Sequence, residues 1–292
     1  MNKLVFANLL YRPVRSLISV LAVAIEVVMI LSIVGIFMGM LNDQKARTNG
    51  IGADLMMRAS NASTMNGVGG ATMPVKFAEV LRRLPHVAVV SPVNMQLSTQ
   101  GSVEVIYGID YPSFNAMKPF AFIAGSSFQG PDDVIIDDVF ARANGGHHVG
   151  ETLQVFGHGF RVSGIVEHGR GGRKLLPLDT MGDLTGSSGK ASIFYIKCDD
   201  PANAQAVIQA IHSTRGLESY PVQTMEEWLS LMTPDKIPGF NIALNIVTGI
   251  AVIVGFLVIF QTMYTAVLER TREIGILKSM GASRLYIVSI VL

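Results

Sequence analysis

The sequence has one cysteine and few charged residues, and both shortages limit what the protein can be. Cys198 has no second cysteine to pair with, which excludes an internal disulfide framework and a cysteine-based zinc site; we interpret it as a small apolar residue near the end of a strand. Charged residues make up 15% of the 292 residues, against roughly 25% in soluble domains. The formal net charge of +1, with no basic block, gives no indication of nucleic acid binding.

Apolar residues are concentrated near the two ends of the chain, which indicates a membrane protein with a soluble middle part. Leu17 to Leu41 is long enough, at about 1.5 Å per helical residue, to cross the roughly 30 Å hydrocarbon core of a bilayer. A signal peptide is the alternative, because basic residues precede the run. However, the apolar part of a signal peptide has about 7–15 residues, and no cleavage site follows Leu41. We therefore expect an uncleaved first span at 17–41, after an amphipathic segment at 1–16.

A second apolar run predicts another span at 239–268, and a third apolar run begins at 283–292. The short run at the end cannot cross a bilayer as a helix. We expect the chain to be a fragment of a longer one, truncated in its third span; the alternative is a short re-entrant tail.

Basic residues set the expected orientation in the membrane. They precede the first span and follow the second, as Lys3, Arg12 and Arg15, and as Arg270, Arg272, Lys278 and Arg284. Positive charge favours the cytoplasmic side of a membrane. Both charge-rich ends are therefore expected in the cytoplasm of a multi-pass protein in the bacterial inner membrane. The part at 42–238 is then periplasmic or extracellular.

Strand and helix patterns alternate in this middle part. Alternating apolar residues predict strands at 53–60, 103–110 and 191–198, and a hairpin at 152–166 after a buried strand at 134–136. Helical periodicity predicts helices at 75–84 and 201–213, and Thr224 with Glu227 is a capping box that starts another. The Gly-rich stretches 61–74 and 168–190 are expected to be loops. The expected fold is an extracytoplasmic α+β domain of two lobes, flanked by α-helical transmembrane spans.

No pattern in the sequence predicts a catalytic, cofactor or metal site. The segment "GSSGKAS" fails as a phosphate-binding loop, because Leu184 stands where the first glycine is required and Ala191 follows Lys190. We interpret the histidines as solvated loop residues rather than metal ligands, since they lack helical ligand spacing; these are His147, His148, His158 and His168. With no G-x-S-x-G motif either, we expect no enzyme activity in this chain and an energy source elsewhere.

Glu26 is the one acidic residue inside the first span, about 13 Å from its start. A carboxylate at that depth costs several kcal/mol unless it is protonated or paired. One interpretation is a polar contact inside a helix bundle or on a substrate path. The other is a protonated carboxyl group packed against a neighbouring helix.

A charged segment, "LERTREIGILKSMGAS", separates the second and third apolar runs. On a helix Glu269 and Arg272 share one side, while Ile274, Leu277 and Met280 form an apolar strip. Gly275 allows close approach of a partner, and Gly281 suits a left-handed C-cap. A short helix of mixed charge with an apolar edge is typical of a docking element at 269–282. The alternative, a basic flank that only anchors the span, does not account for the two glutamates.

Three segments resemble one family. The motif "ERTREIGILKSMGAS" resembles the signature of MacB/FtsX-like ABC transporter permeases, and "NLLYRPVRSLISVLAVAIEV" resembles their first amphipathic segment and span. Residues 132–167 are similar to a stretch of the MacB-like periplasmic core domain. Glu26 and the stretch 168–190 depart from the family pattern.

The resemblance implies a permease subunit with four spans that works as a homo- or heterodimer with an ABC ATPase. In the family the charged helix docks on the ATPase; the residues predicted to do so here are Glu269, Arg270, Arg272, Glu273, Ile274, Gly275, Leu277, Lys278 and Gly281. ATP hydrolysis would then move the periplasmic domain to export a peptide, drug or lipoprotein, together with a periplasmic membrane-fusion protein. The alternatives are an FtsX-like regulator that transports nothing, or a ligand sensor.

Overall fold

The computed structural model describes residues 13–59, 71–99, 104–233, 236, 240–269, 271–281 and 283. The chain divides into two compact units. One combines Met1–Gly39 with Ile237–Leu292, and the other is Met40–Lys236. The predicted amphipathic segment at 1–16 and the start of a third span at 283–292 lie mostly outside the described residues.

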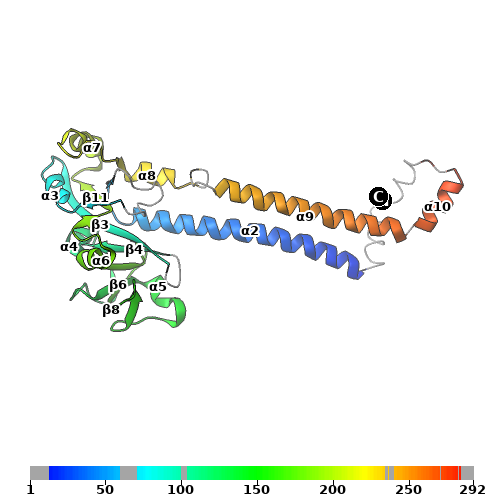
Figure 1. Ribbon diagram of the computed structural model, residues 1–292, viewed down its shortest axis with the longest axis horizontal. Helices are drawn as coiled ribbons and strands as arrows, with labels where there is room; N and C mark the ends of the chain where they lie inside the picture. The colour runs from blue at the N-terminus through cyan, green and yellow to red at the C-terminus, as the bar shows by residue number, and fades with distance from the viewer. Residues whose placement is uncertain are drawn as a thin grey trace. The chain divides into compact units, whose positions relative to one another are not determined.

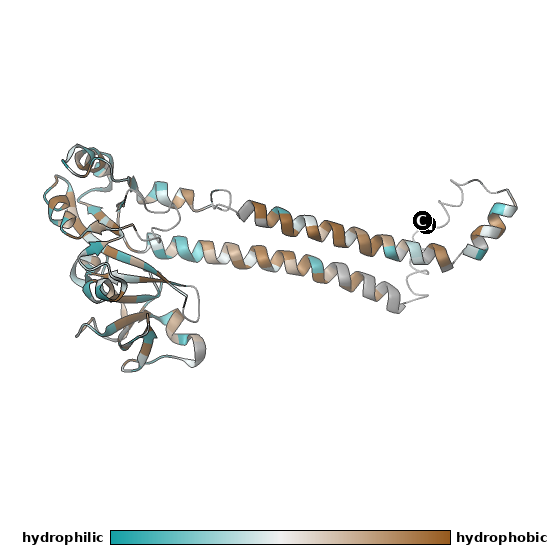
Figure 2. Ribbon diagram, viewed as in Figure 1, coloured by the Kyte–Doolittle hydropathy of each residue, from teal (hydrophilic) through white to brown (hydrophobic). Residues whose placement is uncertain are grey.

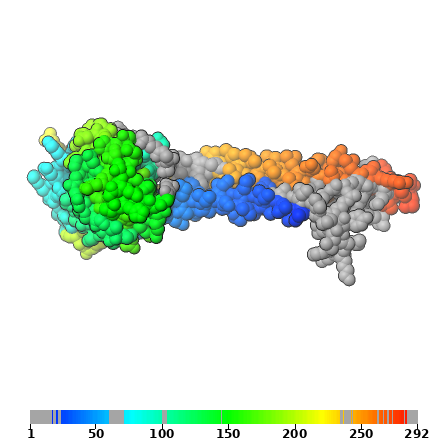
Figure 3. All heavy atoms as spheres, turned by 90° about the horizontal axis from the view of Figure 1, so that it is seen from below, coloured from blue at the N-terminus to red at the C-terminus, as the bar shows by residue number. Residues whose placement is uncertain are grey.

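The first unit contains two long helices that lie side by side, α2 (Pro13–Asn49) and α9 (Phe240–Glu269), and the short α10 (Thr271–Ser279) (Figures 1 and 3). Ala24–Asn49 and Leu244–Thr265 are long and apolar enough to cross a membrane. Apolar residues lie all around α9 (Figure 2), as in a membrane helix rather than an amphipathic surface helix. Helix α2 contains the expected first span and continues to Asn49, so its last residues belong to the second unit.

The second unit is built on a sheet of ten described strands in the order β12-β1-β11-β3-β4-β9-β6-β8-β5, with β7 also paired to β8. Most neighbours are antiparallel, but β4 pairs with β9 and β6 pairs with β8 in parallel. The strands are β1 (Leu55–Arg58), β3 (Val87–Ser98), β4 (Glu104–Ile109), β5 (Phe122–Gly125), β6 (Asp133–Asp137), β7 (Thr152–Val155), β8 (His158–Val166), β9 (Lys174–Pro177), β11 (Ile193–Cys198) and β12 (Val222–Thr224). A separate pair is formed by β2 (Met73–Pro74) and β10 (Lys190–Ala191).

Short helices cover both faces of this sheet, which confirms the predicted α+β fold. They are α3 (Phe77–Leu81), α4 (Tyr111–Met117), α5 (Asp138–Arg142), α6 (Leu178–Thr185), α7 (Ala204–Ser213) and α8 (Met225–Leu231), with 3₁₀ turns η1 (Ala143–Gly145) and η2 (Pro201–Asn203). The predicted capping box starts α8: Glu227 N–H donates to the Thr224 hydroxyl at 3.1 Å, and Thr224 N–H donates to the Glu227 carboxylate at 3.0 Å.

The two lobes share the sheet, and the alternation of side chains along the strands divides its core between two faces. On one face, α3 and α7 cover the first lobe (β12, β1, β11, β3 and β4) around Leu81 and Phe194. On the same face, α5 covers the second lobe (β6, β8, β5 and β7) around Phe160, and α6 packs on β4, β3 and β9 with Met181 in the same cluster. The other face buries Tyr107 and other residues under α4, α8 and the end of α2.

Strand β9 joins the two lobes, and here the expected loop at 168–190 is wrong. This stretch contains β9, α6 and the start of β10, and β9 lies between β4 and β6. The strand is short and begins with a lysine, so it lacks an apolar alternation. Lys174 is nevertheless buried, because it forms an ion pair with Glu104 on β4 and its ammonium group lies 4.3 Å from the centre of the Phe140 ring.

The buried pair predicts a stability test at this seam. Glu104→Ala leaves the Lys174 ammonium group without a counter-charge, so we expect a loss of about 3 kcal/mol in the free energy of unfolding. The double variant Glu104→Leu with Lys174→Met, which removes both charges, should recover most of that loss. Denaturant unfolding of the purified chain measures both values, and equal losses in the single and double variants would contradict a buried, paired lysine.

Candidate functional site: a clamp on the first helix

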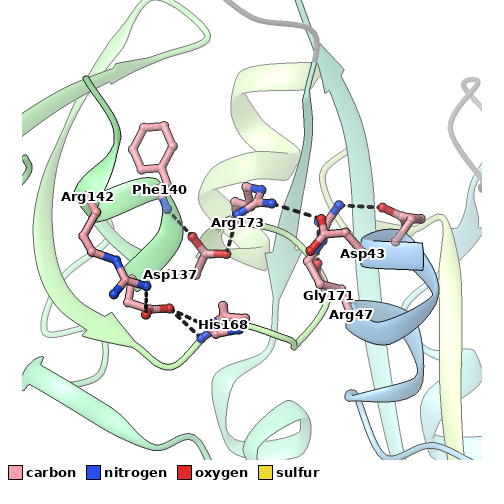
Figure 4. Close-up of polar contacts among 10 residues, drawn as sticks. Asp43, Arg47, Asp137, Phe140, Arg142, His168, Gly171 and Arg173 are labelled. Carbon is pink, nitrogen blue, oxygen red and sulfur yellow. Dashed lines mark hydrogen bonds and ion pairs between the residues drawn. The ribbon is translucent and has the colours of Figure 1, made fainter. Parts of the chain in front are cut away.

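The end of α2 is bonded to the segment that precedes β9 (Figure 4). Arg47 Nη1 donates a hydrogen bond to the Gly171 carbonyl oxygen at 2.9 Å, and Gly171 N–H donates to the Arg47 carbonyl oxygen, also at 2.9 Å. Arg47 is held in place on its own helix by Asp43 and Gln44, at 3.0 and 2.7 Å. Two reciprocal bonds therefore fix this segment against the last turns of the helix.

Arg173 extends the contact to the second lobe. Its Nη2 lies 3.0 Å from Asp43 Oδ2 on α2, and its Nη1 lies 3.3 Å from Asp137 Oδ2 at the start of α5. The buried Asp137 also caps α5 by accepting the Phe140 N–H at 2.6 Å. Burial raises the pKa of Asp137 above its usual value, although the Phe140 N–H and the charges of Arg173 and Arg47 act in the opposite direction.

The clamp is hereafter this set of side chains and one glycine: Asp43, Arg47, Asp137, Gly171 and Arg173. The arrangement requires glycine at two positions, because the segment that contains Gly169 and Gly171 lies very close to the end of α2 and to the Tyr107 ring. A Cβ at Gly50, just after α2, would lie 1.7 Å from the Gly169 carbonyl oxygen. Gly171 has a φ of +64°, and a Cβ there would lie 2.9 Å from the Tyr107 ring. A side chain at Gly50 would push the segment away from the end of α2, and one at Gly171 would push it away from Tyr107 on β4.

Arg170 anchors the same segment in the core. It is 8% exposed, and its guanidinium carbon lies 4.1 Å from the centre of the Phe120 ring and 5.4 Å from that of Phe114. It donates one hydrogen bond to the Phe114 carbonyl oxygen at 3.2 Å. Burial lowers the pKa of Arg170 to about 10, and the aromatic faces compensate part of the lost hydration.

The segment begins at His168, which is bonded to α5. The His168 N–H donates to Asp138 Oδ1 at 2.9 Å, and its ring Nδ1 lies 2.9 Å from the same oxygen, while Arg142 contacts Oδ2 at 2.6 Å. Burial alone would raise the pKa of Asp138, but the hydrogen bonds from His168 and the charges of His168 and Arg142 lower it below its usual value. Both ends of the segment are therefore tied, one to α5 and the other to α2.

The other histidines also lie beside carboxylates. His147 and His148 lie in the loop before β7, as predicted, and His148 is exposed, whereas the half-buried His158 lies on β8 rather than in a loop. His147 and His148 contact Glu151 at 3.1 and 3.3 Å, and His158 contacts Asp132 at 2.8 Å. Among the described residues no group of three or more possible ligands is arranged to hold a metal ion. The "GSSGKAS" segment forms the end of α6 and the turn into β10.

Glu26 points from α2 toward α9 in the first unit. A Cβ added to Gly255 of α9 would lie 3.5 Å from Glu26 Oε2. The carboxyl group lies in an apolar groove of about 330 Å³, which is lined by Met29, Ile250 and other apolar residues. Its Oε1 is shielded from solvent and has no hydrogen-bond partner among the described residues.

Helix α10 carries part of the predicted docking set. Arg272 and Lys278 are exposed, Ile274 and Leu277 are half-buried, and Gly275 is exposed between them. Gly281 follows α10 with a φ of +86°, as expected of a C-cap. Arg270 and Ala282, and the side chains of Glu269 and Glu273, lie outside the described residues. The ATPase-docking role of the set stays a prediction.

The family model for the MacB-like periplasmic core domain matches residues 16–214, more than half of the chain. The chain belongs to this family. Residues 245–292 match the model of the FtsX-like permease C-terminal region. The protein is therefore a membrane protein of the MacB/FtsX-like ABC transporter permease family, with an α+β extracytoplasmic domain between its apolar helices.

Several relatives of the MacB/FtsX-like permease are known. The macrolide export ATP-binding/permease protein MacB of Hyphomonas neptunium is 25% identical over 97% of this chain and 48% of its own length. The uncharacterised ABC transporter permease YknZ of Bacillus subtilis is 29% identical over 46% of this chain and 34% of its own length. The chain spans less than half the length of these relatives.

Solved structures of similar domains share 15% identity with the chain. The periplasmic region of MacB from Actinobacillus actinomycetemcomitans has a TM-score of 0.47, covering 61% of this chain and 92% of that one. The extracellular domain of the transporter YknZ from Gram-positive bacteria has a TM-score of 0.45, covering 59% of this chain and 98% of that one.

The clamp residues of this permease are absent from the predicted site residues. Asp43 and Arg47 have the spacing of an ion pair on a helix, and they follow an apolar run, which is a weak signal that the helix continues beyond the membrane. Nothing in the sequence pairs them with Gly171 or Arg173.

The clamp predicts how strongly the backbone amide hydrogens near Gly171 are protected from exchange with solvent. Arg47→Met removes one of the two bonds to Gly171 and the partner of Asp43, so we expect amide hydrogens at 169–173 to exchange at least about tenfold faster. Lys45→Met is the matched control, because Lys45 lies on the same helix and forms no ion pair with the described residues. Hydrogen exchange with mass spectrometry compares the two, and equal exchange in both variants would contradict the clamp.

Proposed function

We propose that the chain is the permease subunit of a MacB-type ABC exporter, which converts ATP hydrolysis by a partner ATPase into movement of its external domain. The observation that carries the proposal is the continuity of α2. One uninterrupted helix runs from the predicted membrane span to Asn49, and its last turns hold the clamp. A helix of 37 residues is about 55 Å long, which exceeds the hydrocarbon thickness by several turns.

The clamp turns a displacement of α2 into a displacement of the sheet. A shift of the helix end pulls on the segment before β9 through Arg47, and on the start of α5 through Asp43 and Arg173. Charge-assisted hydrogen bonds are stronger than neutral ones and hold their geometry. These bonds tie the second lobe to the helix, while the first lobe is attached to it by the direct continuation of the chain into β1 and by the packing of the helix end on the sheet.

The ATPase partner docks on the charged segment at 269–282 in the cytoplasm. Its mixed charge, with Glu269, Glu273 and Lys278, provides contacts that a basic membrane anchor does not. A second permease copy, identical or related, completes a dimer, and a periplasmic membrane-fusion protein is a further partner. The cargo is a peptide, drug or lipoprotein.

An FtsX-like regulator remains the second candidate, because residues 245–292 match the FtsX-like permease model. Such a regulator would use the same transfer of movement from α2 to the external domain through the clamp. The difference is the outer partner, which would be an activated hydrolase rather than an exported cargo.

The proposed docking of the ATPase predicts that reversing the charge of Glu273 weakens the complex. Glu273→Lys turns an attraction into a repulsion at the contact, so we expect the partner ATPase to co-purify at about one tenth of the wild-type yield or less. The permease itself should still insert in the membrane.

Glu226→Lys is the matched control, since Glu226 is an exposed glutamate on α8 in the second unit. It should retain the ATPase. If Glu273→Lys retains the ATPase as well as Glu226→Lys does, the docking role of the segment is wrong.

A further inference from the structure

A groove is lined by residues of α3 and α6, by Pro92 of β3, and by the segment from Ile109 to Pro112 at the end of β4 and the start of α4. Its volume is about 540 Å³, within the roughly 300–1,000 Å³ that is usual for ligand sites. Pro92 and Ile109, both buried, form its base. Helix α3 belongs to the first lobe and α6 follows β9 directly. Phe128, between β5 and β6, contributes to the lining from the second lobe, so the groove lies at the seam between the lobes.

The two walls of the groove differ in charge. Helix α3 and the residue before it contribute Lys76, Glu79 and Arg82, and the opposite wall contributes Asp110 and Asp179. Arg82 is already engaged, since its Nη2 donates to the Val90 carbonyl oxygen at 3.2 Å.

The acidic wall has unused capacity to accept hydrogen bonds. Asp110 accepts one long hydrogen bond, from the Ser113 N–H at 3.4 Å. Asp179 is exposed and forms no ion pair with the described residues. A cation is therefore the complementary group on this side of the groove.

Aromatic and proline side chains make the rest of the lining apolar. Tyr111 and Phe128 meet edge to face with ring centres 6.0 Å apart, and Pro112 and Pro177 lie next to them in the lining. The Tyr111 ring stacks on the Phe120 ring with ring centres 5.9 Å apart, so Phe120 holds the Tyr111 ring in position. Such surfaces bind apolar side chains and extended backbone.

We propose that the groove binds an extended cationic peptide segment of the transported cargo, a proposal that rests on the exporter function above. A lysine or arginine side chain of the peptide pairs with Asp110 and Asp179. An apolar side chain packs on Tyr111, Phe128 and the prolines. Lys76, on the opposite wall, donates to carbonyl oxygens of the peptide.

The groove is linked to the clamp through the chain itself. Arg173 is followed by β9, and β9 by Leu178 and Asp179, which line the groove. A shift of α2 that moves Arg173 therefore shifts Asp179, one of the two carboxylates of the acidic wall, relative to α3. The peptide affinity depends on the position of α2, and by thermodynamic linkage the peptide biases that position in return.

The test uses two fluorescein-labelled decapeptides, one alternating leucine and lysine and the other alternating leucine and glutamate. Each is titrated against the full chain in phosphatidylcholine nanodiscs, and binding is followed by fluorescence anisotropy. We expect the leucine–lysine peptide to bind and the leucine–glutamate peptide to bind at least about tenfold more weakly.

Charge variants then locate the binding to the groove. Asp179→Lys should weaken binding of the leucine–lysine peptide about tenfold, and Asp179→Asn by less, because it removes the attraction without adding a repulsion. Glu167→Lys is the matched control: Glu167 is exposed and lies outside the groove. It should bind as the wild type does.

Equal affinity for both peptides overturns the proposal, as does an equal loss in Asp179→Lys and Glu167→Lys. Retention of the ATPase is measured on the same preparations, so that two failures are distinguishable. If the ATPase is retained and the peptide result fails, the groove proposal alone falls. If the peptide result holds and the wild-type chain retains no ATPase, the exporter function falls, and the groove remains a peptide site.

Discussion

Arg173 bridges two carboxylates from distant parts of the chain and ties the end of α2 to the second lobe. Asp43 comes from the end of the helix and Asp137 from the start of α5 in the second lobe. Because Asp137 is buried and caps α5, it cannot move without moving the helix that it caps. Arg47 adds a second attachment at Gly171. The end of α2 is thus bonded to the second lobe by charged groups, in addition to its direct continuation into β1 of the first lobe.

The order of the strands determines which parts of the domain a displacement of α2 would reach. Strand β9 is the only described strand between β4 and β6, so the two lobes meet at one short strand. Its buried Lys174 pairs with Glu104 of the first lobe and lies over Phe140 of the second. The clamp lies just before this strand and the groove just after it. The clamp and the groove therefore lie at the two ends of the strand that joins the lobes.

Local patterns in the sequence predicted much of the fold. The apolar runs, the alternation in β4 and β11 and the Thr224 capping box depend on neighbouring residues, and the structure contains each of them. The charged motif at 269–282 was recognised for the same reason. Strand β9 was missed because a buried lysine opens it and glycines precede it, and burial of that lysine depends on Glu104 from another strand. The contacts of Arg173 and Gly171 with α2 join residues far apart in sequence, and no local pattern reports them.

The central claim is that α2 moves the lobes through Arg173. Spin labels at Gln209→Cys in the first lobe and Gln154→Cys in the second, both exposed positions, report the distance between the lobes, since the native Cys198 is buried. Pulsed electron–electron double resonance of the permease–ATPase complex, with and without a non-hydrolysable ATP analogue, measures the change in this distance. The account predicts a nucleotide-dependent change that Arg173→Gln abolishes while the complex stays assembled. The same change in Arg173→Gln as in the wild type would contradict it.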